Sequence, residues 1–283
     1  MIKEIFSDIF IVNSKLLNLI GIQSFRYSLA SLIYFLRGLI FKWNKTKLSN
    51  QLEDDGIVII NEFLNQNDMQ QLSEDFYKIF KENKKEIIQD GDTTTERITI
   101  HIDEIENFKS LQGIVLNGNL INLLETAERR RFKNKKFHNP GKYGQVIWID
   151  KIKNNGNKIK DSQKTLHSDT FFNTHKVWYF PYEVTDDMGP LCFVKKSHKF
   201  NFHKLVLEYL NSISREADTN VRANKQKLDK YENKIFKCSV KSNSLVVANT
   251  RGFHKRGDSF ANKERYQIHF RVRIDPFKEL LIQ

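Results

Sequence analysis

The sequence predicts a mainly β domain that is flanked by helices. In the second half of the chain, short runs of β-branched and aromatic residues recur between glycine, proline and asparagine, and such runs are typical of strands. In the first half, apolar residues return at steps of three and four, which is the spacing of an amphipathic helix. We expect strands at residues 57–60, 145–152, 191–194 and 266–273, and another through Trp178. Within residues 240–249 we expect two strands with a Ser-Asn-Ser turn between them.

The 283 residues are enough for one large domain with an appendage. We expect residues 1–47 to form an N-terminal helical segment and residues 48–283 to form the main domain. Residues 201–235 are long, charged and helical in pattern between two strand regions, which is unusual for a connection in a compact domain. We expect this insertion to be a lid over the mouth of a pocket.

The composition narrows the class of partner. The chain has 46 Lys and Arg against 34 Asp and Glu, a net charge of +12, which favours anionic partners. The basic residues are scattered, and no helix-turn-helix, zinc-finger or RNA-binding motif accompanies them, so we exclude nucleic acid. The two cysteines, Cys192 and Cys238, are too few for a disulfide framework and fit a reducing cytoplasm.

Residues 1–47 carry an apolar stripe with basic flanks. The uncharged run between Arg26 and Arg37 has ten residues, well short of the roughly 20 that span a bilayer, and no cleavage site follows it. Two interpretations stay open. One is a pair of helices packed on the main domain. The other is an amphipathic helix that lies on anionic lipid. In that case a cytoplasmic protein would contact the inner membrane surface peripherally through residues 1–45. The stripe consists of Phe25, Leu29, Leu32, Ile33, Leu36, Ile40 and Trp43.

Between the two ends of the main domain, the pattern alternates between helices and polar loops. Asn65 or Asn67 is placed to cap a helix over residues 68–83. Residues 81–91 are polar and predict a loop, and residues 114–129 predict another helix. A polar stretch at residues 154–163 then predicts a loop that leads into the most informative part of the chain.

That part is the tripeptide His167-Ser168-Asp169. On an extended strand the side chains of His167 and Asp169 point the same way and Ser168 points the opposite way. An imidazole and a carboxylate on one side, joined by a second imidazole, form the two-histidine, one-carboxylate set that suits non-haem ferrous iron. The tripeptide alone is a weak signal, because it arises often by chance.

Further residues follow in a specific order. After Asp169 come the Gly189-Pro190 turn, Ser197-His198, the distant His254 and then Arg265, eleven residues beyond His254. This ordered set, over about residues 48–277, resembles the phytanoyl-CoA dioxygenase family of iron- and 2-oxoglutarate-dependent oxygenases. The resemblance implies a double-stranded β-helix, the jelly-roll barrel, as the core of the domain.

The resemblance also implies roles for single residues. His167, Asp169 and His254 would hold Fe(II), and Arg265 would bind the far carboxylate of the cosubstrate 2-oxoglutarate, with dioxygen as the second cosubstrate. A planar guanidinium meets a carboxylate in two parallel hydrogen bonds. Trp178 matches a family aromatic beside the cosubstrate. Arg256 stands where the family commonly has a small hydroxyl residue, so either it takes part in cosubstrate binding or that half of the site differs.

The remaining pocket residues are hypotheses about the substrate. Lys176 shares a strand face with Trp178 and is expected to meet the cosubstrate or an acidic substrate. Basic residues around the motif favour an anionic substrate that is small or linked to a lipid; they are Lys176, Arg251, Lys255 and Arg256. The candidate substrate contacts, for which core packing is the competing interpretation, are Tyr143, Gln145, Trp148 and His175.

The predicted activity is hydroxylation with release of succinate and CO₂. The alternative from another class is a non-catalytic jelly-roll module that binds carbohydrate or lipid at a membrane surface. A third interpretation is a cupin-like oxygenase that needs no cosubstrate.

Overall fold

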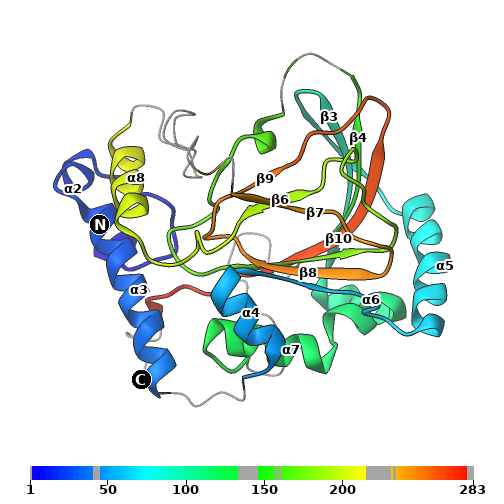
Figure 1. The fold of residues 1–283 in the computed structure, drawn as a ribbon, viewed down its shortest axis with the longest axis horizontal. Helices are drawn as coiled ribbons and strands as arrows, with labels where there is room; N and C mark the ends of the chain where they lie inside the picture. Colours follow the sequence, from blue (N-terminus) through cyan, green and yellow to red (C-terminus); the bar gives the residue numbers. More distant parts are fainter. Residues whose placement is uncertain are drawn as a thin grey trace.

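Two antiparallel sheets form the centre of the molecule in the computed structural model (Figure 1), which describes residues 2–40, 45–132, 146–156, 159, 161–214, 231 and 234–278. The larger sheet has the order β1-β8-β5-β10-β4-β3-β2 and the smaller one β7-β6-β9. The strands of the larger sheet are β1 (Ile57–Ile60), β2 (Glu86–Asp90), β3 (Thr93–His101), β4 (Val146–Asn154), β5 (His175–Phe180), β8 (Ser244–Asn249) and β10 (Glu264–Val272). Those of the smaller sheet are β6 (Leu191–Val194), β7 (Ile235–Cys238) and β9 (His254–Arg256).

The larger sheet is covered by helices on one face and by the smaller sheet on part of the other. Leu72, Phe76 and Leu124 belong to the helical side of a core that also includes Val177 and Ile268 of the sheet. A second core joins the two sheets, with Trp178 and Val246 from one and Phe193 from the other. The predicted class, β with flanking helices, is confirmed. The covering helices are α4 (Lys47–Asp55), α5 (Gln66–Glu82), α6 (Lys109–Val115) and α7 (Gly118–Glu128).

Strand alternation gives the larger sheet one apolar and one polar face. On β10, Ile268 and Phe270 lie in the helix-covered core, whereas Arg265, His269 and Arg271 line a cavity on the opposite face. The same alternation holds in the neighbouring strands, because successive side chains of a strand point to opposite faces. The site described below is therefore built on the face that the helices leave open.

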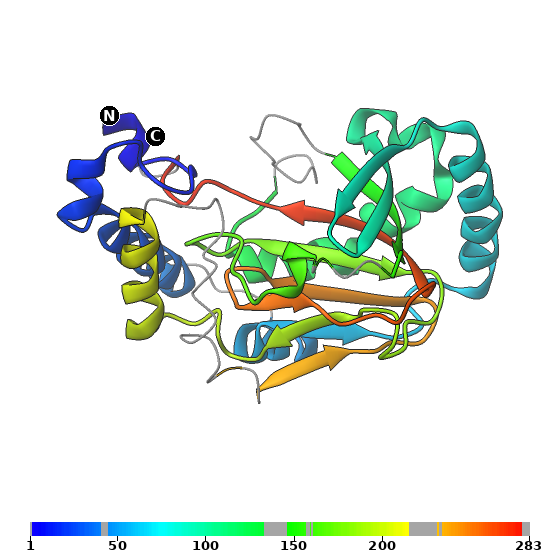
Figure 2. The same cartoon turned by 90° about the horizontal axis from the view of Figure 1, so that it is seen from above.

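The N-terminal helices gather with α8 (Phe202–Ile213) at one end of the molecule (Figure 2). The guanidinium of Arg26 is fully buried and donates hydrogen bonds to four carbonyl oxygens of residues 5–10. This single side chain ties the N-terminal loop to α3, because its planar fork supplies several donors at once. Within the described residues, no helix has the length and apolar character needed to cross a membrane. The helices of this end are α1 (Ile2–Ile5), α2 (Lys15–Leu19), α3 (Ile22–Ile40) and α8.

Three predicted elements differ from the structure. The predicted loop at residues 81–91 contains β2, which pairs with β3 as a hairpin. The predicted helix at residues 114–129 is two helices, because Asn117 caps α7 with its side chain. Residues 240–249 form one strand, β8, preceded by an isolated bridge at Val240. Of the predicted lid, the structure describes α8, Tyr231 and the chain from residue 234; residues 215–230, 232 and 233 lie outside the described part.

Candidate active site

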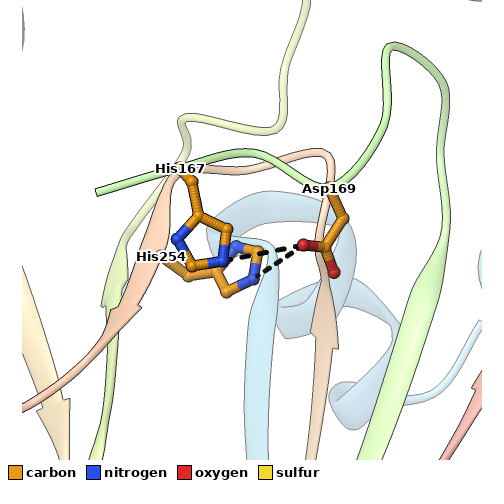
Figure 3. A group of neighbouring side chains, drawn as sticks. All are labelled: His167, Asp169 and His254. Carbon is orange, nitrogen blue, oxygen red and sulfur yellow. Dashed lines mark ion pairs between the residues drawn. The ribbon is translucent and has the colours of Figure 1, made fainter. Parts of the chain in front are cut away.

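Three side chains converge beside the smaller sheet (Figure 3). The Nε2 atoms of His167 and His254 lie 3.7 and 3.5 Å from the same oxygen, Oδ1, of Asp169. Their possible ligand atoms all lie within 4.8 Å of one another, and in the described chain no other such group of His, Cys, Asp and Glu is found. Ligands at about 2.1 Å from one ion are about 3 to 4 Å apart, so the three donors have the spacing of a metal site.

The backbone fixes this arrangement. His167 and His254 face each other in an isolated antiparallel bridge, and the amide of Asp169 donates to the carbonyl of Thr250 at 2.9 Å. Ser168 points away, and its hydroxyl donates to the carbonyl of Arg251 at 2.8 Å. The segment is a bridge and not the predicted regular strand, yet the alternation of its side chains is that of a strand.

Both imidazoles are set in the tautomer that a metal needs. Nδ1 of His167 lies 2.8 Å from the carbonyl oxygen of Thr165, and Nδ1 of His254 lies 2.9 Å from that of Gly252. A carbonyl oxygen only accepts hydrogen bonds, so each Nδ1 carries the proton and each Nε2 presents a lone pair. This is the usual support of metal-binding histidines.

The carboxylate of Asp169 is ionised. Burial alone would raise its pKa, but Lys176, His254 and His167 together hold the pKa well below its usual range. Nζ of Lys176 lies 3.4 Å from Oδ2, the oxygen that faces away from the histidines. Lys176 and the two imidazoles therefore keep this carboxylate in its ionised form, which is the form that can bind a metal ion.

A cavity of about 370 Å³ opens beside these donors. His167, His254 and Arg265 are among the residues that line it. Arg265 is 7% exposed, and neither its Nε nor its Nη1 has a hydrogen-bond partner. Burial, with a contribution from nearby Arg256, lowers the pKa of Arg265 to about 9. A buried cation without partners is costly, and a bound anion would supply them.

Part of the cavity wall is a polar network that the sequence did not reveal. Arg97 binds both oxygens of Asp150, at 2.8 and 2.9 Å. His269 lies 2.8 Å from Asp150 Oδ2, and its ring stacks on Trp148 with centroids 5.2 Å apart. Burial would raise the pKa of Asp150, but His269 and Arg97 lower it far below its usual value. Trp148 also lines the cavity; that it contacts a substrate stays a prediction.

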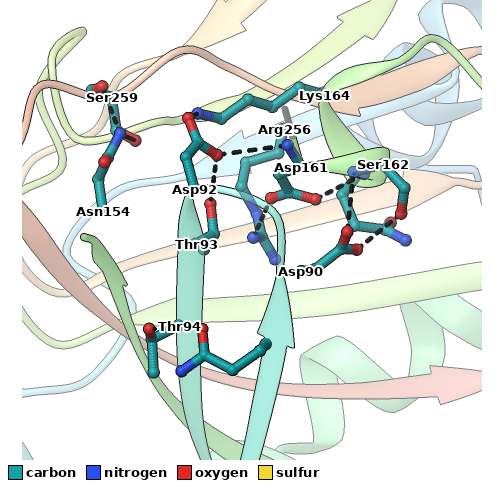
Figure 4. Close-up of polar contacts among 12 residues, drawn as sticks. Asp90, Asp92, Thr93, Thr94, Asn154, Asp161, Ser162, Lys164, Arg256 and Ser259 are labelled. Carbon is teal, nitrogen blue, oxygen red and sulfur yellow. Dashed lines mark hydrogen bonds and ion pairs between the residues drawn. The ribbon is translucent and has the colours of Figure 1, made fainter. Parts of the chain in front are cut away.

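A second network holds the segment that precedes His167 (Figure 4). Arg256 forms an ion pair with the buried carboxylate of Asp161. Ser162 donates to Asp90 through its amide at 3.0 Å and also through its hydroxyl, and Lys164 forms an ion pair with Asp92 at 2.5 Å. These contacts join the β2–β3 hairpin and β9 to η3 (Ser162–Lys164), next to the carbonyl that orients His167.

The structure brings most of the predicted residues together and separates others. Lys176, Trp178, Lys255 and Arg256 all line the cavity. His175 lies on the helix-covered face of the sheet, with Nδ1 2.5 Å from Glu128. It lines a second cavity of about 270 Å³, as does Arg251.

The second cavity corrects two expectations about the pocket. Arg251 donates to the hydroxyl of Ser31 at 2.5 Å and lies over the ring of Tyr27, so it is not among the basic residues of the first cavity. His175 begins β5 on the face opposite Lys176, because adjacent strand residues point to opposite sides. Tyr143 and Gln145 lie outside the described residues.

Comparison with known proteins decides the family. A family model described as phytanoyl-CoA dioxygenase (PhyH) matches residues 52–258, which include His167, Asp169 and His254. The chain belongs to the PhyH family. It is accordingly a 2-oxoglutarate-dependent oxygenase that uses Fe(II), 2-oxoglutarate and O₂. The comparison with curated protein sequences gives no significant match.

Solved structures share the PhyH-type jelly roll. The epimerase SnoN in complex with Fe³⁺, alpha ketoglutarate and nogalamycin RO has a TM-score of 0.55 at 12% identity, over 80% of this chain and 81% of that one. The carbocyclase SnoK from nogalamycin biosynthesis has a TM-score of 0.52 at 14% identity, over 81% of this chain and 83% of that one. HygX from Streptomyces hygroscopicus, with nickel and 2-oxoglutarate bound, has a TM-score of 0.50 at 12% identity, over 80% of this chain and 86% of that one. At such identities the likeness concerns the fold.

The residues of this chain fit the cofactors of the PhyH family. Two imidazoles with free Nε2 lone pairs and one ionised carboxylate match the ligand set of non-haem Fe(II). The unpartnered atoms of Arg265 lie in the same cavity and fit a carboxylate.

Proposed function

We propose that this PhyH enzyme hydroxylates a small or lipid-linked organic anion and releases succinate and CO₂. The observation that carries the proposal is one cavity lined both by His167 and His254, two of the three candidate metal ligands, and by Arg265, whose buried Nε and Nη1 have no hydrogen-bond partner. The enzyme would act in the cytoplasm, at the inner surface of the membrane where its substrate is linked to a lipid. The catalytic domain would span residues 48–283, with residues 201–235 as its lid.

In this proposal each residue has a defined task. His167, Asp169 and His254 would hold Fe(II), which when bound supplies the activation of dioxygen. Arg265 would bind the far carboxylate of 2-oxoglutarate in the fork of its guanidinium. Trp178, which is 7% exposed and lines the cavity, would shield the cosubstrate from water.

Arg256 would act on the cosubstrate indirectly. Its ion pair with Asp161 engages its guanidinium, so it is less available than Arg265 for a carboxylate. Arg256 would therefore position the Asp161 segment and add positive potential to the cavity. This assigns Arg265, and not Arg256, as the residue that binds the cosubstrate.

Two cations on neighbouring strands support an anionic substrate. Lys176 and Arg271 are directly opposite each other in the register of β5 and β10, and both line the cavity. Like charges placed opposite each other destabilise a sheet. Nε of Arg271 has no hydrogen-bond partner, and the ion pair of Lys176 is with Asp169, the residue that a metal would engage. An anionic group of the substrate would stabilise this pair of cations.

The experiment is a succinate-release assay with Fe(II)-loaded protein, 2-oxoglutarate and O₂. The substrate panel contains organic phosphates, carboxylates and lipid extracts, each beside a neutral analogue. We expect stimulation by anionic members, and an Arg271→Gln variant should raise the KM for the best of them about 10- to 100-fold, as the loss of one charged hydrogen bond implies. Stimulation by the neutral analogues alone would contradict the substrate class.

The control for Arg271→Gln is Arg131→Gln, which removes the same charge from a side chain that is 73% exposed and bound to Glu125. It should leave the KM unchanged. A turnover that requires no 2-oxoglutarate would instead favour a cupin-like oxygenase, and a protein that binds its ligand without metal would favour the non-catalytic module.

A further inference from the structure

The apolar stripe of α3 faces away from the protein. Its members are between 44% and 73% exposed, although they are large hydrophobic residues. Their spacing of three, four and seven places them on one side of the helix. An exposed apolar strip of this length is uncommon on a monomeric protein and marks a contact with another molecule or a membrane. This exposed stripe consists of Phe25, Leu32, Phe35, Leu36, Leu39 and Ile40. It differs from the predicted stripe, of which Leu29 and Ile33 pack inward beside Tyr27 and Trp43 lies outside the described residues.

The opposite side of α3 is fixed to the protein by polar contacts. Arg26 donates to the carbonyls of the N-terminal loop, and Gln23 donates to Glu208 of α8 at 3.0 Å. Both side chains are buried, together with Tyr27. Rolling the helix to bury its stripe would break these hydrogen bonds and leave buried polar groups unpaired, which is costly. The outward orientation of the stripe is thus a stable feature of the fold.

Two other helices extend this apolar surface. Leu19, the last residue of α2, and Ile20, which follows it, are 61% and 70% exposed. Phe202 of α8 is 75% exposed. Tyr209 of α8 donates to the carbonyl of Leu19 at 3.1 Å, so the helices are in contact. All three lie at one end of the molecule (Figures 1 and 2). We call the exposed residues of α2, α3 and α8 the apolar end.

The charge around the apolar end is positive. Residues 9–52, which contain α2 and α3, include no acidic residue and six basic ones: Lys15, Arg26, Arg37, Lys42, Lys45 and Lys47. Of these, Lys15, Lys45 and Lys47 are exposed. A second copy of this chain would bring the same excess of positive charge against it, with few acidic partners: Glu53 already pairs with Lys45, and Glu4 accepts from the amide of Asn13. Anionic lipid headgroups complement it, and the bilayer takes up the apolar side chains.

We propose that the apolar end docks on the surface of an anionic lipid bilayer. Its longest helix, α3, has 19 residues and a length of about 28 Å, and it would lie in the plane of the interface. The docked end is also connected to the metal site. Lys204 of α8 is fully buried and donates to the hydroxyl of Ser168 at 2.8 Å, directly behind His167 and Asp169.

Vesicle flotation of the full chain tests the docking without any activity measurement. The vesicles are phosphatidylcholine with one quarter phosphatidylglycerol, or phosphatidylcholine alone, at low and high salt. We expect flotation with the anionic vesicles at low salt and weaker flotation at high salt, because salt screens the headgroup charge. A Leu36→Glu/Leu39→Glu variant should lose at least about tenfold in partitioning, since it removes two exposed apolar side chains and adds repulsion.

The matched control is Leu116→Glu/Tyr77→Glu, two exposed apolar residues, 47% and 73% exposed, outside the apolar end. It should float like the native chain. Absence of native flotation at low salt, equal flotation of Leu36→Glu/Leu39→Glu, or equal binding to neutral vesicles would overturn the proposal. A native dimer in gel filtration that Leu36→Glu/Leu39→Glu dissociates would also overturn it and assign the surface to a second copy.

Discussion

At the scale of single residues, the proposal assigns cosubstrate binding to Arg265. Its side chain is buried and lacks partners for Nε and Nη1. The guanidinium is therefore already desolvated before 2-oxoglutarate binds. We expect Arg265→Gln to weaken 2-oxoglutarate binding about 30- to 150-fold, the equivalent of about 2 to 3 kcal/mol for a charge-assisted pair. Anaerobic calorimetry with Fe(II)-loaded protein measures this directly.

Arg265→Lys distinguishes geometry from charge. Lysine keeps the positive charge but cannot offer two parallel donors, so its affinity should lie between those of the native protein and Arg265→Gln. Native-like affinity in both variants would mean that another residue, with Arg256 the first candidate, binds the carboxylate.

The sequence predicted residues whose types and order are specific, and missed residues that only the fold brings together. His167, Asp169, His254 and Arg265 could be named because few chemistries require that set. Asp150 and Arg271 could not, because each lies on a strand in which polar residues alternate with apolar ones, and nothing in the sequence gives the register that joins β4, β5 and β10. Strand alternation alone places His175 on the face opposite Lys176, whereas the direction of Arg251, in the turn after β8, is not given by any strand.

At the scale of elements, the turn from α4 into β1 depends on Gly56. Its φ of +80° is left-handed, and a Cβ there would lie 2.3 Å from Nδ1 of His198. Gly56→Ala should therefore destabilise the protein by about 2 to 4 kcal/mol, from backbone strain and overpacking together. Urea unfolding measures the change.

The control is Gly118→Ala, at the first residue of α7, where no atom lies within 4 Å of the added Cβ. It should be neutral or slightly stabilising, because alanine favours a helix. Equal stability of Gly56→Ala and the native chain would show that α4 and β1 are joined differently.

The hairpin of β2 and β3 shows why some elements escape sequence analysis. Its strands carry Asp90, Thr95 and Arg97 toward the cavity, so they lack the apolar alternation by which strands are predicted. Strands that build a polar site resemble loops in sequence. The break between α6 and α7 is missed for another reason: the apolar pattern runs on through it, and only the cap at Asn117 interrupts the helix.

At the scale of the whole molecule, His198 makes stability depend on pH. Burial lowers its pKa to about 3, and its Nε2 lies 3.1 Å from the carbonyl oxygen of Glu53. In the unfolded chain its pKa is about 6.5, so the unfolded state binds the proton first. The contribution is therefore present above pH 6.5 and is lost as the pH falls from 6.5 toward 3.

Between pH 7 and pH 5 this one residue should lower the free energy of unfolding by about 2 kcal/mol. Urea unfolding at both values, in the native chain and in His198→Gln, measures the difference. Glutamine can keep the donor to Glu53 but does not titrate, so its stability should change less over this range. An identical pH dependence in both proteins would assign the effect to other groups.

The orientation of the N-terminal helices also appears only in the whole molecule. The sequence left open whether the stripe of α3 packs on the main domain or meets a membrane, since both require the same periodicity. Burial of Arg26 on the inner side, against four carbonyl oxygens, turns most of the stripe outward, whereas its members Leu29 and Ile33 pack inward. A charged residue on the buried side of a helix is the kind of exception that periodicity cannot predict.

The most direct test of the account is an anaerobic Fe(II) titration of the native chain and of Asp169→Ala, each with 2-oxoglutarate present. We predict one tightly bound iron per native chain and loss of that site in Asp169→Ala, with the protein still folded by circular dichroism. Equal iron binding by the two folded proteins would contradict the assignment of His167, Asp169 and His254 as the metal site.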